Sequence, residues 1–454
     1  MSETGKIAFL GLGAMGFGMA TNLLSNKLQV TGFDVWPPTL EKFVAAGGSS
    51  SSTPREAVKS APYVVFMVAT AAQILSALFD PETGAIETLE QGATLILCST
   101  GPPEHSPNVR KLLDEKNRTD VKVIDAPVSG GTIRAANGTL TILASGNEED
   151  IAGARKVLDV MAGPNLYLIP GGLGAGTKVK MVHQVLAGIH IVMSSEAMGF
   201  AAKLGLDTRK AYEVLKKGEG MSWMFENRGP HMIVPDEKVY SALGIIVKDI
   251  GIVTAASRRT TSNPGFPLFL SSATEQVLAA GISAGYDRLD DAQLTRVYLP
   301  STPSLVLDLA SQDASCTDFT PEETSKLKLV ESTMKAVHLV SAMEAMSLGK
   351  TVGLETNQLF EIIKGAAGSS WMFADRTPQL LSGKWTSKET VNDTIDSLTT
   401  AITEANALKY PLHLAAITLQ ILQLASLKGY GDEPDLAVSR VWDRETSLYP
   451  GKRV

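Results

Sequence analysis

The second half of the chain contains one sequence pattern twice, and this repeat restricts the available folds more than any other feature. The segment Lys178-Val-Lys-Met-Val recurs as Lys326-Leu-Lys-Leu-Val, and Ser222-Trp-Met-Phe recurs as Ser370-Trp-Met-Phe. The two copies of the lysine (328 − 180) and of the tryptophan (371 − 223) are both 148 residues apart. Equal separations at two places indicate a duplication, and the period is far longer than that of a solenoid repeat. The pattern therefore predicts two copies of a whole domain.

Before the repeat, short apolar runs alternate with helical patterns. Several runs are continuously apolar, as buried strands of a parallel sheet with helices on both faces must be. One helix is expected to begin at Thr53-Pro54, because a capping threonine, a proline and then Glu56 form a helix-start signal. The alternation predicts a doubly wound α/β sheet. Its expected strands are residues 7–10, 30–33, 64–68, 95–98, 121–124, 140–143 and 167–169.

A glycine-rich turn follows the first expected strand and opens a helix. It is the GxGxxG motif Gly11-Leu12-Gly13-Ala14-Met15-Gly16. In such a motif the first glycine permits the tight turn, the second lets the backbone approach a pyrophosphate, and the third lets helix and strand pack closely. N–H groups at the start of the helix, around Ala14 and Met15, then face the phosphate. This context favours a dinucleotide-binding (Rossmann) domain over a glycine turn that binds nothing.

An acidic residue stands where such a domain binds the ribose of its cofactor. Asp34 ends the next expected strand, 18 residues after Gly16 (34 − 16). Its carboxylate would accept hydrogen bonds from the ribose hydroxyls and repel a 2′-phosphate, which predicts NAD rather than NADP. The alternative is a solvated carboxylate at the end of a strand.

The pattern changes after Pro170. Residues 171–176 form a glycine-rich joint, and beyond it the sequence is helical to the end. A segment rich in Ser, Thr and Asp, 301–320, is expected to link the two repeat copies. We therefore predict an α/β Rossmann domain followed by two tandem all-α domains. The predicted boundaries are 1–170 for the nucleotide-binding domain, 171–315 for the first helical copy and 316–454 for the second.

Composition and charge restrict the partners of the chain. The formal net charge is −7 and no concentrated basic patch appears, so nucleic acid is not expected to bind. The most apolar long segment, 179–202, contains Lys180 and Glu196 and is expected to be a buried helix, so no membrane span is predicted. Cys98 and Cys316 cannot form a disulfide framework or a zinc site, and no signal peptide is recognised. These features favour a reducing, cytoplasmic compartment.

Three further segments carry a resemblance to a known family. The sequence Asp125-Ala-Pro-Val-Ser-Gly-Gly, the GxGxxxK pattern of residues 174–180 and the pair Lys248-Asp249 resemble the motifs of the β-hydroxyacid dehydrogenases, in the same order. Together with the glycine motif they extend the resemblance over about residues 6–300. The resemblance implies an N-terminal Rossmann domain, an all-helical domain and an active site between them, with Lys180 as the catalytic residue.

The chemistry of alcohol oxidation agrees with that resemblance. The reaction requires a hydride acceptor, a base for the hydroxyl proton and an anchor for the substrate carboxylate. Lys180 can act as the base, because it is expected at the start of a long apolar helix, where the helix dipole and partial burial would lower its pKa. Ser129 and the backbone N–H groups of Gly130 and Gly131 can bind the carboxylate, with Lys248 adding charge.

Two residues that follow the lysine on its helix are further candidates. His183 and Gln184 lie three and four residues after Lys180 and share its helix face, where they can contact substrate hydroxyls. The alternative for the histidine is a place in the core. The resemblance also implies that Ser99 and Thr100 lie on the nicotinamide side of the site.

The second repeat copy supplies a comparison for these candidates. Lys328 occupies the place of Lys180, so this lysine could serve the helical fold, but no glycine joint and no nucleotide domain precede Lys328. After one deleted residue, Ile395-Asp396 takes the place of Lys248-Asp249, which favours a structural role for Asp249.

Substrate preference rests on resemblance alone. Residues 179–183 also resemble 6-phosphogluconate dehydrogenase, but Gln184, Ala187 and Gly188 replace its residues for decarboxylation and phosphate binding. The His183-Gln184 pair departs from the asparagines of 3-hydroxyisobutyrate dehydrogenases and is similar to the L-threonate/D-erythronate dehydrogenase branch. This implies a four-carbon polyhydroxy acid, oxidised at C2. A 3-hydroxyisobutyrate-type or other short 3-hydroxyacid dehydrogenase, an NADP-dependent reductase and a non-catalytic NAD-binding scaffold are the alternatives.

The duplication also bears on assembly. In single-copy relatives the helical domains pair between chains, so two copies in one chain could form that pair internally. His190 and His338 recur together and are expected to pack, as are the two Ser-Trp-Met-Phe segments, although Trp223 could wall the pocket. We expect a monomer with an internal pseudo-dimer, or a homodimer, in which the second copy has no active site.

Overall fold

The computed structural model describes residues 5–234, 238–258, 265–312 and 318–442. Within it the chain divides into two compact units, Met1–Lys180 and Met181–Val454. The division falls inside helix α8 (Ala175–Lys203), so the first turns of this helix belong with the first unit. Cys316 and the predicted boundary at residue 315 lie outside the described residues.

The first unit is built on one nine-stranded sheet. Its path runs β3-β2-β1-β4-β5-β6-β8-β7, and β9 pairs with β8. Every predicted strand is present within a few residues of its expected ends, whereas the two-residue strands β3 and β7 carry no apolar run and escaped prediction. The strands are β1 (Lys6–Leu10), β2 (Gln29–Phe33), β3 (Ser49–Ser50), β4 (Tyr63–Phe66), β5 (Thr94–Leu97), β6 (Lys122–Asp125), β7 (Val128–Ser129), β8 (Thr141–Gly146) and β9 (Leu166–Leu168).

The sheet is parallel from β3 to β6, as expected, and becomes antiparallel at β8. The segment between β7 and β8 holds a single short helix, which is too little chain for the crossover that a parallel pair needs. The prediction of a parallel sheet was therefore wrong for the pairs β6–β8 and β7–β8, whereas β8 and β9 are parallel.

Helices cover both faces of this sheet. Alternate residues of β1 belong to two separate cores: Ile7 and Phe9 to one, Ala8 and Leu10 to the other. Thr53 caps its helix as predicted by accepting from Glu56 N at 3.2 Å, but that helix is only four residues long. The helices of this unit are α1 (Gly16–Ser25), α2 (Pro37–Ala45), α3 (Pro54–Ala57), α4 (Ala71–Phe79), α5 (His105–Glu115), α6 (Gly131–Asn137) and α7 (Glu148–Ala162).

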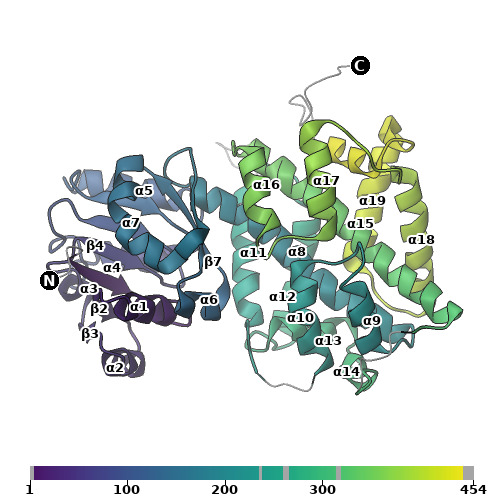
Figure 1. The fold of residues 1–454 in the computed structure, drawn as a ribbon, viewed down its shortest axis with the longest axis horizontal. Coiled ribbons are helices and arrows are strands. Elements are labelled where there is room, and N and C mark those ends of the chain that lie inside the picture. The colour runs from purple at the N-terminus through teal and green to yellow at the C-terminus, as the bar shows by residue number, and fades with distance from the viewer. Residues whose placement is uncertain (1–4, 235–237, 259–264, 313–317, 443–454) are drawn as a thin grey trace. The chain divides into compact units, whose positions relative to one another are not determined.

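The second unit is helical throughout its described part, apart from isolated bridges (Figure 1). Helix α8 is long and apolar enough to cross a membrane by length and composition, but all of its apolar window is buried among the other helices. The other α-helices described in this unit are α9 (Thr208–Leu215), α10 (Trp223–Ile233), α11 (Leu243–Ser257), α12 (Phe269–Ser283), α13 (Thr295–Tyr298), α14 (Leu305–Asp308), α15 (Pro321–Thr351), α16 (Thr356–Lys364), α17 (Trp371–Ser382), α18 (Val391–Ala407) and α19 (His413–Ala425).

Contacts between the two repeat copies are reciprocal. Trp223 N donates to Ser369 O at 2.9 Å, and Trp371 N donates to Met221 O at 3.0 Å. These two hydrogen bonds flank a bridge between Ser222 and its counterpart Ser370 (370 − 222 = 148). The first copy therefore contacts the second through the same residues by which the second contacts the first.

The long central helices exchange carboxylates in the same way. Glu196 of α8 accepts the N–H groups of Leu414 and Ala415 at the start of α19, at 3.0 and 3.1 Å. Glu344 of α15 accepts the N–H groups of Leu270 and Ser271 at the start of α12, at 3.0 and 3.1 Å. Each copy therefore caps a helix of the other with a buried glutamate.

The histidine pair and the two Ser-Trp-Met-Phe segments were expected to pack in the core. The rings of His190 and His338 meet edge to face with centroids 4.3 Å apart, and both side chains are fully buried, as predicted. Phe225 and Phe373 are likewise fully buried. Trp223, in contrast, is 40% exposed and is not a core residue.

The predicted one-residue deletion before Asp396 was wrong. Leu243 N donates to Leu289 O in the first copy, and Val391 N donates to Glu433 O in the second, so α11 and α18 begin 148 residues apart (391 − 243). Both helices run on without a break, which pairs Asp249 with Ser397 (397 − 249 = 148). A one-residue deletion inside a helix would turn every later side chain by about 100° around the helix axis. The alignment of Asp249 with the identical residue Asp396 is therefore incompatible with the helix geometry.

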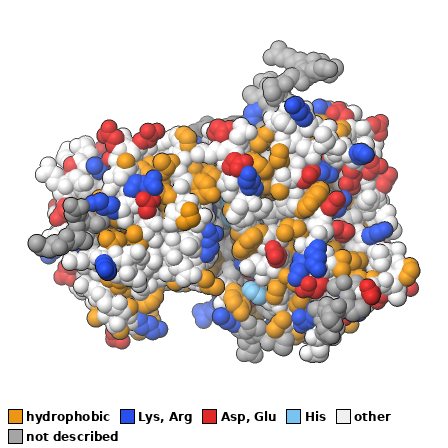
Figure 2. Space-filling model, in the orientation of Figure 1, with side chains coloured by type: hydrophobic (Ala, Val, Ile, Leu, Met, Phe, Trp, Pro, Cys, Tyr) orange, Lys and Arg blue, Asp and Glu red, His pale blue; other side chains and the backbone are white. Residues whose placement is uncertain are grey.

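Charged side chains of both signs are interspersed over the face drawn in Figure 2, where neither sign forms a broad patch.

Candidate functional site

The three glycines of the GxGxxG turn have different roles. Gly11 has a φ of 98°, and a Cβ there would lie 2.4 Å from Met67 O, so neither the conformation nor the space admits a side chain. A Cβ on Gly16 would lie 1.9 Å from Gly11 O, which makes this glycine necessary for helix–strand packing. A Cβ on Gly13 would meet no atom within 4 Å. Gly13 therefore faces open space, as close approach of a pyrophosphate requires.

The start of α1 is also suited to a phosphate. Ala14 is exposed and Met15 half-buried, and Met15, the residue before the helix, makes no side-chain cap to it. The side chain of Met15 thus leaves the N–H groups at the positive end of α1 unoccupied, so these groups can bind an external anion.

Asp34 is held in place next to this turn. Its Oδ2 accepts from Leu12 N at 2.7 Å, and its Oδ1 accepts from Trp36 N at 2.9 Å. Each carboxylate oxygen has two acceptor positions, so both can accept again from ribose hydroxyls. The half-buried carboxylate at the end of β2 and the open glycine turn fit a dinucleotide.

Ser99 and Thr100 follow β5 at the same edge of the sheet. Ser99 is buried, and its hydroxyl accepts from Val68 N at 2.9 Å, which ties the loop after β5 to the loop after β4. Thr100 is half-buried beside it. The carboxyl ends of parallel strands form the ligand-binding edge of an α/β sheet, and both residues lie there.

Ser129, Gly130 and Gly131 join β7 to α6. Gly130 has a φ of 138°, and a Cβ there would lie 2.9 Å from Cδ of Arg134. Gly131 has a φ of 73° and open space around its Cα. Ser129 is half-buried while both glycines are exposed, so their backbone N–H groups lie at an accessible turn.

A buried carboxylate fixes the first turn of α8. Asp125, at the end of β6, accepts from Thr177 N at 2.8 Å and from the Thr177 hydroxyl at 2.7 Å. The Ser145 hydroxyl donates to Asp125 at 3.2 Å and accepts from Gly176 N at 2.9 Å. Burial raises the pKa of Asp125 to about 6, although these hydrogen bonds oppose the shift. The sequence motif contained Asp125, but nothing in it indicated this role.

This anchor positions Lys180, which is buried and lies one turn after Thr177 on α8. Because α8 begins at Ala175, Lys180 is in its second turn, whereas the helix dipole acts within the first turn. The dipole therefore acts more weakly on Lys180 than a place in the first turn would allow, and the ammonium group is buried.

His183 and Gln184 form a hydrogen-bonded chain with the lysine–aspartate pair of α11. His183 Nδ1 lies 2.9 Å from Gln184 Oε1, Gln184 Nε2 donates to Asp249 Oδ2 at 2.5 Å, and Lys248 Nζ lies 3.2 Å from Asp249 Oδ1. The first three of these side chains are buried, and that of Lys248 is 38% exposed. The structure thus brings together three predicted site residues through Asp249.

The second repeat copy completes this chain. Gly368 N donates to His183 Nε2 at 3.1 Å. A ring nitrogen that accepts carries no proton, so a neutral His183 holds its proton on Nδ1 and donates it to Gln184 Oε1. Gln184 has a second amide hydrogen, which no hydrogen bond among the described residues uses. Sequence reasoning missed Gly368, because it is 185 residues from His183 (368 − 183).

Family models match almost the whole chain. Residues 6–171 match the NAD binding domain of 6-phosphogluconate dehydrogenase. Residues 174–298 and 323–442 both match one model, described as NAD-binding of NADP-dependent 3-hydroxyisobutyrate dehydrogenase.

Individual relatives agree with these family matches. The L-threonate dehydrogenase of Cupriavidus necator is 37% identical over 64% of this chain and 96% of its own length. The NAD-dependent L-serine dehydrogenase of Pseudomonas aeruginosa is 32% identical over 57% of this chain and 87% of its own. A crystal structure of 3-hydroxyisobutyrate dehydrogenase from Salmonella typhimurium is 34% identical with a TM-score of 0.58, over 64% of this chain and 99% of that one.

A longer structure matches the fold of nearly the entire chain. The 6-phosphogluconate dehydrogenase of Plasmodium falciparum has a TM-score of 0.59 and 14% identity, over 93% of this chain and 92% of that one. The glycine turn, the sheet that carries it and these matches lead to one conclusion: the chain belongs to the nicotinamide-dependent β-hydroxyacid dehydrogenase family, within the 6-phosphogluconate dehydrogenase-like superfamily.

Proposed function

We propose that this dehydrogenase oxidises the C2 hydroxyl of a four-carbon polyhydroxy acid, such as L-threonate or D-erythronate, with Lys180 as general acid/base. The observation that carries the proposal is the buried Lys180 on a helix fixed by Asp125. The L-threonate dehydrogenases, 33–37% identical to this chain, support the choice of substrate.

In this proposal each group of the chain has one task. Bound nicotinamide supplies the hydride acceptor. Lys180, in its neutral form, takes the hydroxyl proton and returns it in the reverse reaction. Ser129, Gly130 and Gly131 hold the carboxylate with Lys248, and Gln184 donates its second amide hydrogen to a substrate oxygen. His183 orients Gln184, because both of its ring nitrogens have partners.

We propose NAD as the preferred cofactor. The Asp34 carboxylate, fixed by two backbone N–H groups, would accept from a ribose diol and would repel a 2′-phosphate. Comparison of kcat/KM for the two cofactors tests this choice directly, and a higher value with NADP would contradict it.

We also propose that the helical unit is a duplication whose second copy supports the first and has no dehydrogenase site. The reciprocal contacts and the two matches to one family model support this division. A reducing, cytoplasmic compartment and a monomer or homodimer remain predictions, which fractionation and sedimentation can test.

The activity is tested by NAD reduction with a panel of acids: L-threonate, D-erythronate, 3-hydroxyisobutyrate and L-serine. We expect turnover with the four-carbon acids and a decrease of about 10²–10⁴-fold in kcat for Lys180→Ala. Lys178→Ala is the matched control, because Lys178 is half-exposed on the same turn, and it should retain activity.

Three results would change the assignment. Preference for 3-hydroxyisobutyrate or L-serine would change the assigned substrate but not the proposed role of Lys180 in alcohol oxidation. NAD binding without turnover of any acid would favour a scaffold. Full activity of Lys180→Ala would remove the lysine from its role.

A further inference from the structure

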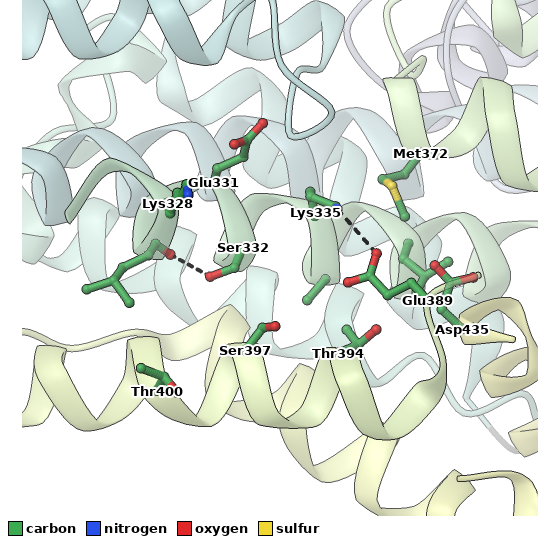
Figure 3. A pocket seen from close by; sticks show the side chains of 13 residues that line it. Lys328, Glu331, Ser332, Lys335, Met372, Glu389, Thr394, Ser397, Thr400 and Asp435 are labelled. Carbon is green, nitrogen blue, oxygen red and sulfur yellow. Dashed lines mark hydrogen bonds and ion pairs between the residues drawn. The ribbon is translucent and has the colours of Figure 1, made fainter. Parts of the chain in front are cut away.

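A cavity of about 440 Å³ lies in the second repeat copy, between α15 and α18 (Figure 3). Its lining includes Lys328, Glu331, Ser332 and Ser397. With the separation of 148 residues established above, these are the counterparts of Lys180, His183, Gln184 and Asp249 in the first copy. The second copy therefore keeps a cavity at the place of the proposed substrate site, with different side chains.

The hydroxyl groups of this cavity are arranged as acceptors. Ser332, Thr394, Ser397 and Thr400 each donate to a backbone carbonyl one turn earlier, at 2.9, 3.1, 2.9 and 2.9 Å. Their hydroxyl hydrogens are thus engaged, and the oxygen lone pairs are left to accept from a ligand. Figure 3 shows Ser332 of α15 and Ser397 of α18 at the gap between the two helices. Such a lining fits a ligand with several hydroxyl donors.

Lys328 provides the charge. Its side chain is exposed, and no described residue forms an ion pair or hydrogen bond with its ammonium group. The other lysine of the lining, Lys335, is neutralised by Glu219 at 2.7 Å and Glu389 at 3.2 Å. One unpaired cation next to carboxylates favours a monoanion over a phosphate dianion.

The remaining lining excludes other ligand classes. Glu331 Oε1 accepts from Glu219 N at 3.1 Å, so this carboxylate already has a fixed partner in the first copy. The lining contains no aromatic side chain on which a nucleobase could stack. The volume lies in the range of small-molecule sites, about 300–1,000 Å³.

We propose that this cavity binds a small hydroxylated carboxylate, with the carboxylate at Lys328 and the hydroxyls at Ser332, Ser397 and Thr400. It is a binding site distinct from the proposed active site. The ligand class rests on the side chains of this cavity and not on the proposed function, although a polyhydroxy acid substrate would belong to the same class.

A methionine of the lining provides a direct reporter. Met372 lines the cavity, and its counterpart Met224 (372 − 148) occupies the equivalent place in the first copy. The full chain, labelled with [methyl-¹³C]methionine, is titrated with L-threonate, and Met372→Leu and Met224→Leu assign the two resonances. We expect a saturable shift of the Met372 resonance with L-threonate, and much weaker responses with erythritol and inorganic phosphate.

Variants test which groups bind. Lys328→Ala should weaken the apparent affinity reported by Met372 by about tenfold, the effect of losing one charge-assisted hydrogen bond. Ser397→Trp should fill the cavity and abolish the shift. Both positions are exposed, so both variants should keep the melting temperature of the parent. Lys384→Ala, an exposed lysine of the same copy outside the lining, is the matched control and should leave the titration unchanged.

The possible outcomes separate this proposal from the proposed function. An unmoved Met372 with a shifting Met224 would overturn the cavity site alone. Absence of turnover with every acid would remove the proposed function, while a Met372 shift sensitive to Lys328→Ala would still support the cavity site. An equal response to erythritol, or a stronger one to phosphate, would overturn the assignment to a carboxylate.

Discussion

At the scale of single residues, Asp125 holds the first turn of the helix that carries the proposed base. It is buried at the end of β6 and accepts two hydrogen bonds from Thr177, three residues before Lys180. A carboxylate that receives the first N–H groups of a helix also favours that helix through its dipole. The position of Lys180 therefore depends on a residue that need not touch the substrate.

Replacement of Asp125 by alanine should lower kcat by about 10–100-fold with a smaller change in KM, because a displacement of about 1 Å can cost 100-fold in rate. Steady-state kinetics with saturating NAD measures both constants. Asp125→Asn, which keeps one acceptor oxygen, should recover part of the loss. Equal kinetics for Asp125→Ala and the parent would show that the start of α8 holds its place without this carboxylate.

At the scale of elements, the helical unit depends on glutamates that cap helices of the other copy. Burial raises the pKa of Glu196 and of Glu344 to about 7, although the N–H groups that they accept oppose the shift. Each group ionises in the unfolded chain around the ordinary glutamate pKa of 4.5 and resists ionisation in the folded chain. The stability that each contributes is thus fully present below pH 4.5 and is lost as the pH rises to about 7.

Glu344→Gln should therefore remove one pH-dependent contribution to the free energy of unfolding. The difference in stability between parent and variant should fall by on the order of 3 kcal/mol between about pH 4.5 and 7.5, measured by chemical denaturation. His190 and His338, whose pKa values are lowered by burial, shift stability in the opposite direction with pH. They are present in both proteins, so their contribution cancels in the difference. A difference that does not change with pH would show that Glu344 keeps an ordinary pKa.

At the scale of the whole molecule, the two repeat copies share the hydrogen-bonded chain that includes the predicted site residues. Gly368, from the second copy, donates to His183 of the first. In the opposite direction, Glu331 of the second copy accepts from Glu219 of the first at 3.1 Å. Each copy thus supplies a loop that contacts the first long helix of the other, and duplication within one chain makes this contact independent of protein concentration.

Gly368→Ala tests this dependence. An added Cβ would lie 3.1 Å from His183 O and 3.3 Å from the His183 ring, so the ring must move by a few tenths of an ångström. We expect KM for the hydroxy acid to rise by about threefold to tenfold, the order of a single disturbed neutral hydrogen bond. Gly365→Ala is the control from the same loop, since its Cβ would meet no atom within 4 Å. Unchanged kinetics for Gly368→Ala would show that the hydrogen bond from the second copy does not affect substrate binding.

The sequence alone determined the features that depend on local chemistry. Continuous apolar runs marked every strand of more than two residues, because buried parallel strands cannot carry polar faces. The glycine turn and Asp34 were identifiable, because a tight turn, a close approach and a ribose acceptor each require a particular residue at a fixed spacing. The separation of 148 residues was visible in the same way.

Tertiary structure decided whatever depends on residues that are distant in the chain. Four features have no signature in the local sequence. They are the antiparallel direction of β8, the correspondence of Asp249 to Ser397, the hydrogen bonds from the start of α8 to Asp125, and the hydrogen bond from Gly368 to His183. Each results from packing two surfaces against one another, which selects one register and one set of buried partners among many that the same sequence pattern permits.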